Sequence, residues 1–265
     1  MHERNGAPAP TDMPVGATGN DGAYETMGTP GHDEQVSSPP SPRMPVPVAT
    51  YVLIVMNVVM YLVTTFFGAT SDMLFAEMRL VPSDILDIGH CWSLLTSMFL
   101  HAGLAHLVAN MYSLFVLGSM CEPIFGRGKY LMTYFIGGVA GGILFSGIHL
   151  ASGSMVTAVG ASGAIFALMG MYGAVLLIAR KKAKAAGVDG ATIGLDGAWQ
   201  RYLMLVAINL FVVPMTGNIA WEAHVGGLLA GFCMGMVFLP RTPNGIDADA
   251  SHGTQPPQSS ANPPA

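Results

Sequence analysis

Residues 160–179 read GASGAIFALMGMYGAVLLIA, a stretch of 20 residues without a charged side chain. A helix of roughly 20 predominantly apolar residues is long enough to cross the hydrocarbon core of a bilayer. The stretch is followed at once by the basic run RKKAK at 180–184, and such runs are typical of the cytoplasmic end of a membrane helix. We therefore predict that residues 160–179 form a transmembrane helix.

Similar apolar segments recur along the chain. Of the 265 residues, 51% are apolar and only 10% are charged, with a mean hydropathy of +0.49, a composition typical of membrane proteins. About six segments approach the length that a membrane-spanning helix needs; they are residues 48–67, 97–117, 130–150, 160–179, 202–217 and 219–239. The fifth is the least well defined, because it is short and Pro214 interrupts it. We predict an all-α membrane protein, a bundle of six transmembrane helices.

Two polar tails flank this apolar region. Residues 1–46 and 241–265 are rich in small and polar residues and proline, and such segments cannot bury enough surface to offset the entropy lost on folding. We predict a disordered tail over 1–46, a six-helix domain over 47–240 and a second disordered tail over 241–265. The first apolar run begins near Val48, too late for a cleaved signal, and we expect it to remain in the membrane as an anchor.

The basic residues predict the orientation of the bundle, because cytoplasmic loops retain Lys and Arg. With the N-terminus inside, all of the 11 Lys and Arg residues except Arg79 fall on the inner side. Both termini are therefore expected in the cytoplasm, and the first turns of the second, fourth and sixth helices meet at the outer face. The long connection 68–96 contains apolar and amphipathic pieces, and we expect it to lie partly in the membrane interface.

Several polar side chains lie in the outer half of this predicted bundle. Such side chains are costly in a bilayer and indicate functional sites when they face a bundle interior; here they are His101, His106, Asn110, Ser162 and His224. His106 and Asn110 are four positions apart and therefore share one helical face. The alternative for this pair is a hydrogen bond between helices that stabilises the bundle.

Ser162 lies in the small-residue sequence Gly160-Ala161-Ser162-Gly163, at the start of a predicted helix. Neighbours this small leave its hydroxyl open to approach. The alternative role is a helix cap. The G-x-S-x-G elbow of soluble hydrolases is absent, because position 164 is Ala.

His224 precedes a stripe of glycines on the same face of the sixth helix, at positions 227, 231 and 235. Glycines allow a neighbouring backbone to approach closely, and the fourth helix offers matching small residues at positions 163, 167, 170 and 174. If these two faces pack together, Ser162 and His224 come within hydrogen-bond reach. The alternative is a histidine that is merely packed.

This set of side chains suits acyl transfer. A nucleophilic serine needs a base, and the oxyanion that forms needs hydrogen-bond donors. His224 can act as the base for Ser162. His106, Asn110 and the Ser162 N–H can act as the donors. Glu222 is the only acidic residue near His224 and, two positions away, points to the other side of the helix. We therefore predict a Ser-His dyad whose imidazole is oriented by packing, such as stacking on an aromatic ring.

Other classes of site find little support. The chain has no basic stripe with interleaved aromatic residues, which argues against nucleic-acid binding. It has no H-E-x-x-H motif and no aspartate pair in the helices, and Cys91, Cys121 and Cys233 lack the spacing of a metal or redox site. We expect no metal and no cofactor. The internal symmetry of a small transporter is also missing.

Three motifs occur in order on alternate helices: H-x-x-x-N at 106–110, G-x-S-G at 160–163 and H-V-G-G at 224–227. With these motifs, and with LLTSMFLHAGLAHLVAN at 94–110, residues 92–239 resemble the rhomboid family of intramembrane serine proteases. The resemblance implies a six-helix core in which Ser162 attacks the substrate to form an acyl-enzyme and His224 acts as general base and then acid. His106, Asn110 and the Ser162 N–H would form the oxyanion hole.

The resemblance also implies supporting residues, which are Gly160, Gly163, Phe166 and Gly227. Phe166 stands where some members have a tyrosine that stacks on the histidine, and Ser93 follows Trp92 where many have arginine.

Substrates would be transmembrane segments of membrane proteins, entering sideways through the lipid bilayer, with the fifth helix and the turn at 214–221 as gate and cap. We expect a multi-pass protein of a bacterial plasma membrane. The alternative is a catalytically silent rhomboid-like protein that binds or chaperones membrane clients; such relatives usually lack the serine or the histidine, and both are present here.

Overall fold

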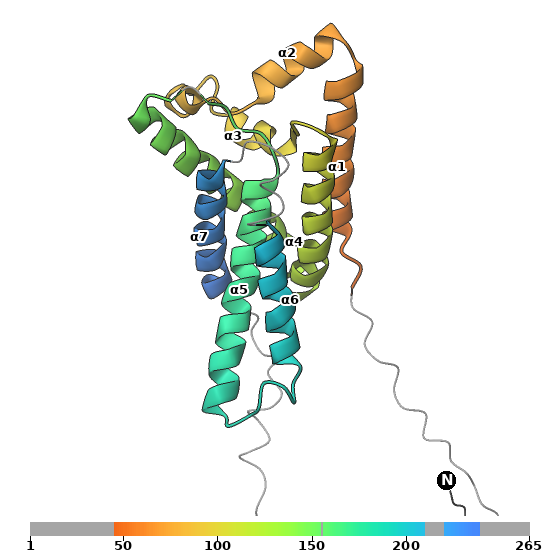
Figure 1. Ribbon diagram of the computed structural model, residues 1–265, viewed down its shortest axis with the longest axis vertical. Coiled ribbons are helices and arrows are strands. Elements are labelled where there is room, and N and C mark those ends of the chain that lie inside the picture. Colours follow the sequence, from red (N-terminus) through yellow and green to blue (C-terminus); the bar gives the residue numbers. More distant parts are fainter. Residues whose placement is uncertain (1–44, 155, 210–219, 239–265) are drawn as a thin grey trace, which may run out of the picture. The chain divides into compact units, whose positions relative to one another are not determined.

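The computed structural model describes residues 45–154, 156–209 and 220–238, and within these ranges the chain is helical, without a strand (Figure 1). The prediction of an all-α protein is confirmed for this part of the chain. The helices are α1 (Val48–Phe66), α2 (Ala69–Met78), α3 (Ser93–Thr96), α4 (Leu104–Ser152), α5 (Ser162–Ala185), α6 (Leu195–Ala207) and α7 (Trp221–Val237), with 3₁₀ turns η1 (Pro82–Leu86) and η2 (Ser97–Phe99). The predicted tails lie outside the described residues, apart from residues 45 and 46.

Three of these helices, α1, α4 and α5, are long and apolar enough to cross a membrane. α4 has 49 residues, but its backbone leaves helical geometry at Gly126, with φ 77° and ψ 157°. A side chain would oppose this conformation, which glycine adopts readily. α4 therefore consists of two helical halves, and these contain most of the predicted spans 97–117 and 130–150.

Several predicted boundaries differ from the observed ones. The second span was expected to begin at residue 97, but residues 97–99 form η2 and Leu100 is extended, so α4 begins at Leu104. The fifth span was expected over 202–217; α6 begins earlier, at Leu195, and residues 210–217 lie outside the described residues. The sixth, expected over 219–239, corresponds to α7.

α5 is the central helix of the described bundle, packed against both α4 and α7. Small residues allow this packing. A Cβ atom added at Gly231 would collide with the Ala167 carbonyl, and one added at Gly227 with the Gly163 carbonyl. The predicted approach of the two small-residue faces is therefore present between α5 and α7.

The first turn of α1 is held by a buried carboxylate from α4. Glu122 accepts hydrogen bonds from the Ala49 N–H (2.9 Å), the Thr50 N–H (2.8 Å) and the Thr50 hydroxyl (2.8 Å). The first N–H groups of a helix have no partner within the helix, and an anion there also interacts favourably with the helix dipole. Glu122 thus fixes the start of α1 against α4.

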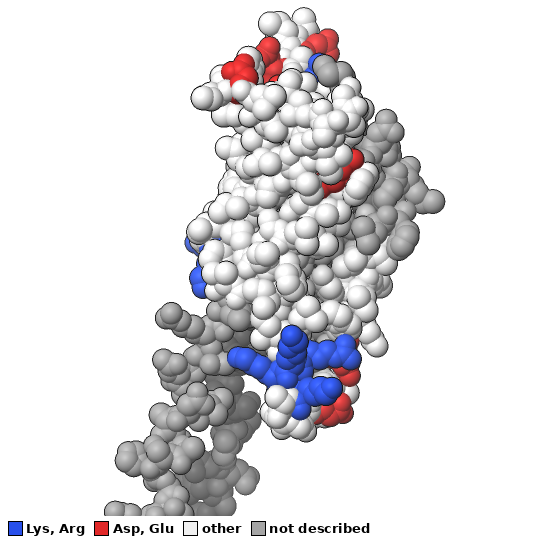
Figure 2. Space-filling view, turned by 90° about the vertical axis from the view of Figure 1, so that its left-hand side faces the viewer, with Lys and Arg blue, Asp and Glu red and all other residues white. Residues whose placement is uncertain are grey.

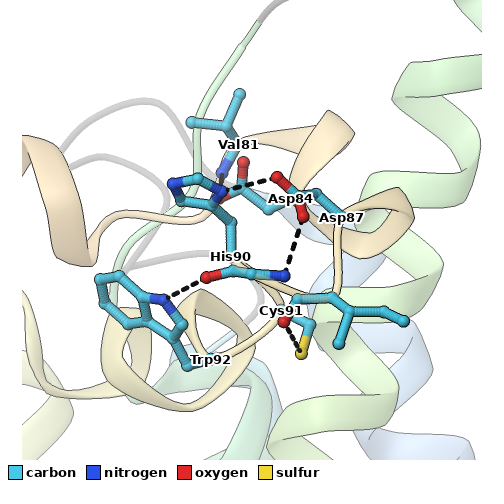
Figure 3. Close-up of polar contacts among 8 residues, drawn as sticks. Val81, Asp84, Asp87, His90, Cys91 and Trp92 are labelled. Carbon is cyan, nitrogen blue, oxygen red and sulfur yellow. Dashed lines mark hydrogen bonds and ion pairs between the residues drawn. The ribbon is translucent and has the colours of Figure 1, made fainter.

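The connection between α1 and α4 contains α2, η1, α3 and η2, and Figure 3 shows polar contacts within its part from Val81 to Trp92. His90 Nδ1 lies 2.8 Å from the Asp87 carboxylate, and the Trp92 indole N–H donates to the Gly89 carbonyl (2.9 Å). Ile88, in the same part of the connection, is 93% exposed. Trp92 is therefore anchored within its own turn.

Charged side chains are unevenly distributed over the surface. Figure 2 shows Lys and Arg gathered at one end beside a few acidic side chains, acidic side chains at the opposite end, and a broad, largely uncharged surface between them. The basic run at 180–184 lies at the end of α5. An uncharged band between two charged ends is what a membrane-embedded surface requires.

Candidate active site

Ser162 and His224 are in direct contact. Ser162 is the first residue of α5 and His224 lies in the first turn of α7, and the Ser162 Oγ is 2.8 Å from the His224 Nε2. The close packing of α5 on α7 brings the two first turns together. A neutral imidazole at this distance can accept the hydroxyl proton, which is the arrangement that activates a serine nucleophile.

The imidazole is held by a ring of α5. Phe166 lies parallel to His224, with ring centroids 4.2 Å apart and an interplanar angle of 9°. His224 is only 7% exposed. Stacking and burial together restrict the imidazole to one plane, and this plane directs Nε2 at Ser162.

His106 and Asn110 approach the same place from α4. A Cβ atom added at Gly160 would lie 3.0 Å from the His106 Nε2 and 3.7 Å from the Asn110 Nδ2. Gly160 also has φ 128°, a value that side chains disfavour. A glycine is thus needed at 160, two residues before Ser162, both for its backbone conformation and for the space it leaves.

Two buried groups near the dyad have no hydrogen-bond partner among the described residues. One is the Asn110 Nδ2, and the other is the imidazole of His101, at both nitrogens. An unpaired buried donor is costly in a folded protein. This Asn110 donor, close to Gly160, is available to a ligand or a reacting group. His101 lies edge-on to His106, with ring centroids 5.2 Å apart.

A small cavity adjoins Ser162. Its volume is about 30 Å³, and its lining includes Ser97, Gly160, Ser162 and Ala223. A cavity needs about 10–15 Å³ to hold one water molecule. The cavity can therefore admit a water beside Ser162, where hydrolysis would require one.

The acidic residue nearest to the histidine in sequence turns away from it. The Glu222 carboxylate reaches α4, where its Oε1 lies 3.4 Å from the His149 Nε2. His149 is the one functional candidate that the sequence reasoning missed. It was detectable, because it is the only Asp, Glu, Lys, Arg or His residue in the segment 130–150.

Within the described ranges, no cluster of His, Cys, Asp or Glu is suited to a metal ion.

The sequence model of the Rhomboid domain family matches residues 89–241, more than half of the chain. This range includes all the residues of the site. The chain belongs to the rhomboid family. This rhomboid is accordingly an integral membrane protein, in agreement with its apolar helices.

Curated relatives include both plant and bacterial rhomboids. The chain is 34% identical over 184 residues to RHOMBOID-like protein 6, mitochondrial, of Arabidopsis thaliana, covering 68% of this chain and 54% of the relative. It is 32% identical over 190 residues to the rhomboid protease GluP of Bacillus subtilis, covering 70% of this chain and 34% of GluP. The putative rhomboid protease YdcA of the same bacterium is 31% identical over 146 residues, with 55% of this chain and 66% of YdcA covered. The matched region thus spans between about a third and two thirds of these relatives.

Proposed function

We propose that this rhomboid is an intramembrane serine endopeptidase that cleaves transmembrane segments of membrane proteins. The observation that carries the proposal is the 2.8 Å contact between the Ser162 Oγ and the His224 Nε2. His224 takes the proton of Ser162 as the hydroxyl attacks the scissile carbonyl, then returns it to the leaving amine. Water attacks the resulting acyl-enzyme and regenerates Ser162. The names of GluP and YdcA as rhomboid proteases support the same activity.

The donors for the oxyanion come from two elements. The Ser162 N–H lies at the start of α5, where helix N–H groups have no partner within the helix. Asn110 offers its unpaired Nδ2 and His106 its imidazole, both near Gly160. Three donors around a developing negative charge stabilise the tetrahedral intermediate. Gly160, Gly163 and Gly227 keep this region free of side chains.

The membrane arrangement that fits this activity has six spans within residues 47–240 and both termini in the cytoplasm. α4 contributes two spans through its break at Gly126. The basic end of α5 then lies in the cytoplasm, and the dyad lies in the outer half of the bilayer. We place the protein in a bacterial plasma membrane, with substrates approaching from the lipid and no metal or cofactor involved.

The decisive test is proteolysis in liposomes with a fluorogenic transmembrane substrate. Ser162→Ala is expected to lower kcat by at least about a thousandfold. Ser83→Ala removes an exposed serine in η1 and should leave the rate unchanged. A fluorophosphonate probe should label Ser162 only while His224 is present. Equal cleavage by wild type and Ser162→Ala would disprove the proposal. Absence of both cleavage and labelling would favour the silent, client-binding alternative.

A further inference from the structure

The first turn of α7 lies between α4 and α5 and has a polar contact on each side. Glu222 is directed at His149 of α4, and His224 at Ser162 of α5. Ala223, between them, faces both neighbours: its carbonyl oxygen would meet a Cβ atom added at Gly141 of α4 or, 3.4 Å away, one added at Gly163 of α5. Three consecutive residues therefore locate this turn against two helices.

Besides these contacts, the turn is held by the stack of His224 on Phe166 and by close packing at glycines. No side chain caps α7 at Ala220, and its first described backbone hydrogen bonds run from Ala223 and His224 to the Ala220 carbonyl. Glycine contacts fix how closely α7 approaches its neighbours, but smooth glycine surfaces resist rotation about the helix axis poorly. The two polar contacts, on opposite sides of the turn, oppose such rotation.

The contact with α4 is buried and isolated. The Glu222 residue is 6% exposed, and in the described part of the chain its only ion-pair partner is His149. The His149 ring packs on Phe145, with centroids 4.4 Å apart, and its Nδ1 is buried without a partner. A carboxylate at this depth is costly unless it is paired. Among the described residues, the His149 side chain therefore has no polar partner other than Glu222.

We infer that Glu222 and His149 are positioning residues, a buried clasp between α4 and α7 that sets the rotation of α7 and so the distance from His224 to Ser162. The inference rests on the proposed protease function. It gives the acidic residue beside the catalytic histidine a role other than that of a third triad member. Its carboxylate acts on the helix that carries the imidazole and not on the imidazole itself.

The test is a double-mutant cycle with Glu222→Gln and His149→Gln, using the liposome assay. Rates are divided by the concentration of folded, monodisperse protein, measured by gel filtration and circular dichroism, so that unfolded protein does not count. Each single variant should lower kcat by about 10- to 100-fold, the usual effect of misplacing a catalytic group by about 1 Å, with KM changed less than about twofold. The double variant should be no worse than either single variant, because both act through one contact.

Two further variants sharpen the test. The exchange Glu222→His with His149→Glu restores the pair and should recover kcat to within about threefold of wild type. Asp87→Asn with His90→Gln removes an exposed His–carboxylate pair of the same chemistry and should leave kcat unchanged. Additive losses in the cycle, unchanged kcat in the single variants, or an exchange no better than the single variants would overturn the inference.

A second readout keeps this inference separate from the proposed function. In ¹⁵N-histidine spectra, the His224 Nε2 resonance should report its hydrogen bond to Ser162 in wild type and lose it in Glu222→Gln. If wild type and Ser162→Ala proved equally inactive, the protease proposal would fall. The spectrum would still test whether Glu222 positions His224 against Ser162. An unchanged His224 resonance in Glu222→Gln would overturn the clasp, whatever the activity.

Discussion

Phe166 is the residue that orients the catalytic imidazole in the proposed dyad. Its ring lies parallel to His224 at 4.2 Å between centroids, as the resemblance to the rhomboid family implied for an aromatic residue at this position. Phe166→Leu should lower kcat by about 3- to 10-fold, because an aromatic pair contributes about 0.5–1.5 kcal/mol beyond its buried area. Phe166→Tyr keeps the ring and should stay close to wild type. Kinetics in liposomes decide the matter, and equal rates for Leu and Phe would show that stacking has no catalytic role.

His90 and Asp87, in the connection between α1 and α4, form a pair that titrates in water (Figure 3). The Asp87 hydrogen bond raises the pKa of His90 above its usual 6.5, with smaller contributions from the charges of Asp87, Asp84 and Glu77. The same bond, helped by the Gly89 N–H, lowers the pKa of Asp87 from 3.8.

The two shifts define the pH range of this pair. The contribution of His90 to folding stability is complete below pH 6.5 and is lost as the pH rises through its raised pKa in the folded protein. The contribution of Asp87 to folding stability is complete above pH 3.8 and is lost as the pH falls through its lowered pKa in the folded protein. An NMR titration of His90 should therefore give a pKa above 6.5, which Asp87→Asn returns toward 6.5. The same value in both proteins would contradict the pairing.

At the scale of the elements, the α5–α7 interface depends on glycine. A Cβ atom at Gly231 would collide with the Ala167 carbonyl, and backbone atoms cannot move aside as side chains do. Gly231→Ala should therefore destabilise the protein by about 1–3 kcal/mol. Gly147→Ala, at an exposed position of α4 with no atom within 4 Å of the new Cβ, is the matched control and should be neutral or slightly stabilising. Thermal unfolding in detergent measures both, and equal melting temperatures would refute the close approach.

α6 is the most loosely held of the longer helices. None of its residues is buried, and just beyond it Asn209 accepts a hydrogen bond of 3.0 Å from the Ser113 hydroxyl of α4. This sparse packing agrees with the weak hydropathic definition of the segment 202–217. The role of this segment as a gate, which the resemblance implies, stays a prediction, because residues 210–219 lie outside the described ranges.

For the whole molecule, the distribution of charge predicts orientation. Cys91 is exposed in the connection next to the proposed outer face, whereas Cys121 is buried. In a Cys233→Ser background, a membrane-impermeant maleimide should label intact cells at Cys91, and Cys91→Ser should abolish the signal. Labelling that appears only after the cells are opened would place this connection in the cytoplasm and reverse the proposed topology.

Sequence alone predicted the family of the protein and the residues that are proposed to react. Hydrophobic length is a local property, so the apolar segments were predictable, although the starts of α4 and α6 differ from the predicted ones by seven residues each. Polar side chains inside these segments were conspicuous because a bilayer makes them costly. The G-x-S-G and H-x-x-x-N motifs added the order in which these groups occur.

Only the tertiary structure decided which groups meet. Three contacts depend on how each helix is rotated and how closely it approaches its neighbour. They are the contact of Ser162 with His224, that of Glu222 with His149, and the hydrogen bonds of Glu122 to the first turn of α1. Rotation and approach follow from packing between residues far apart in the chain. Periodicity shows which residues share a face, but not which face of another helix lies opposite it.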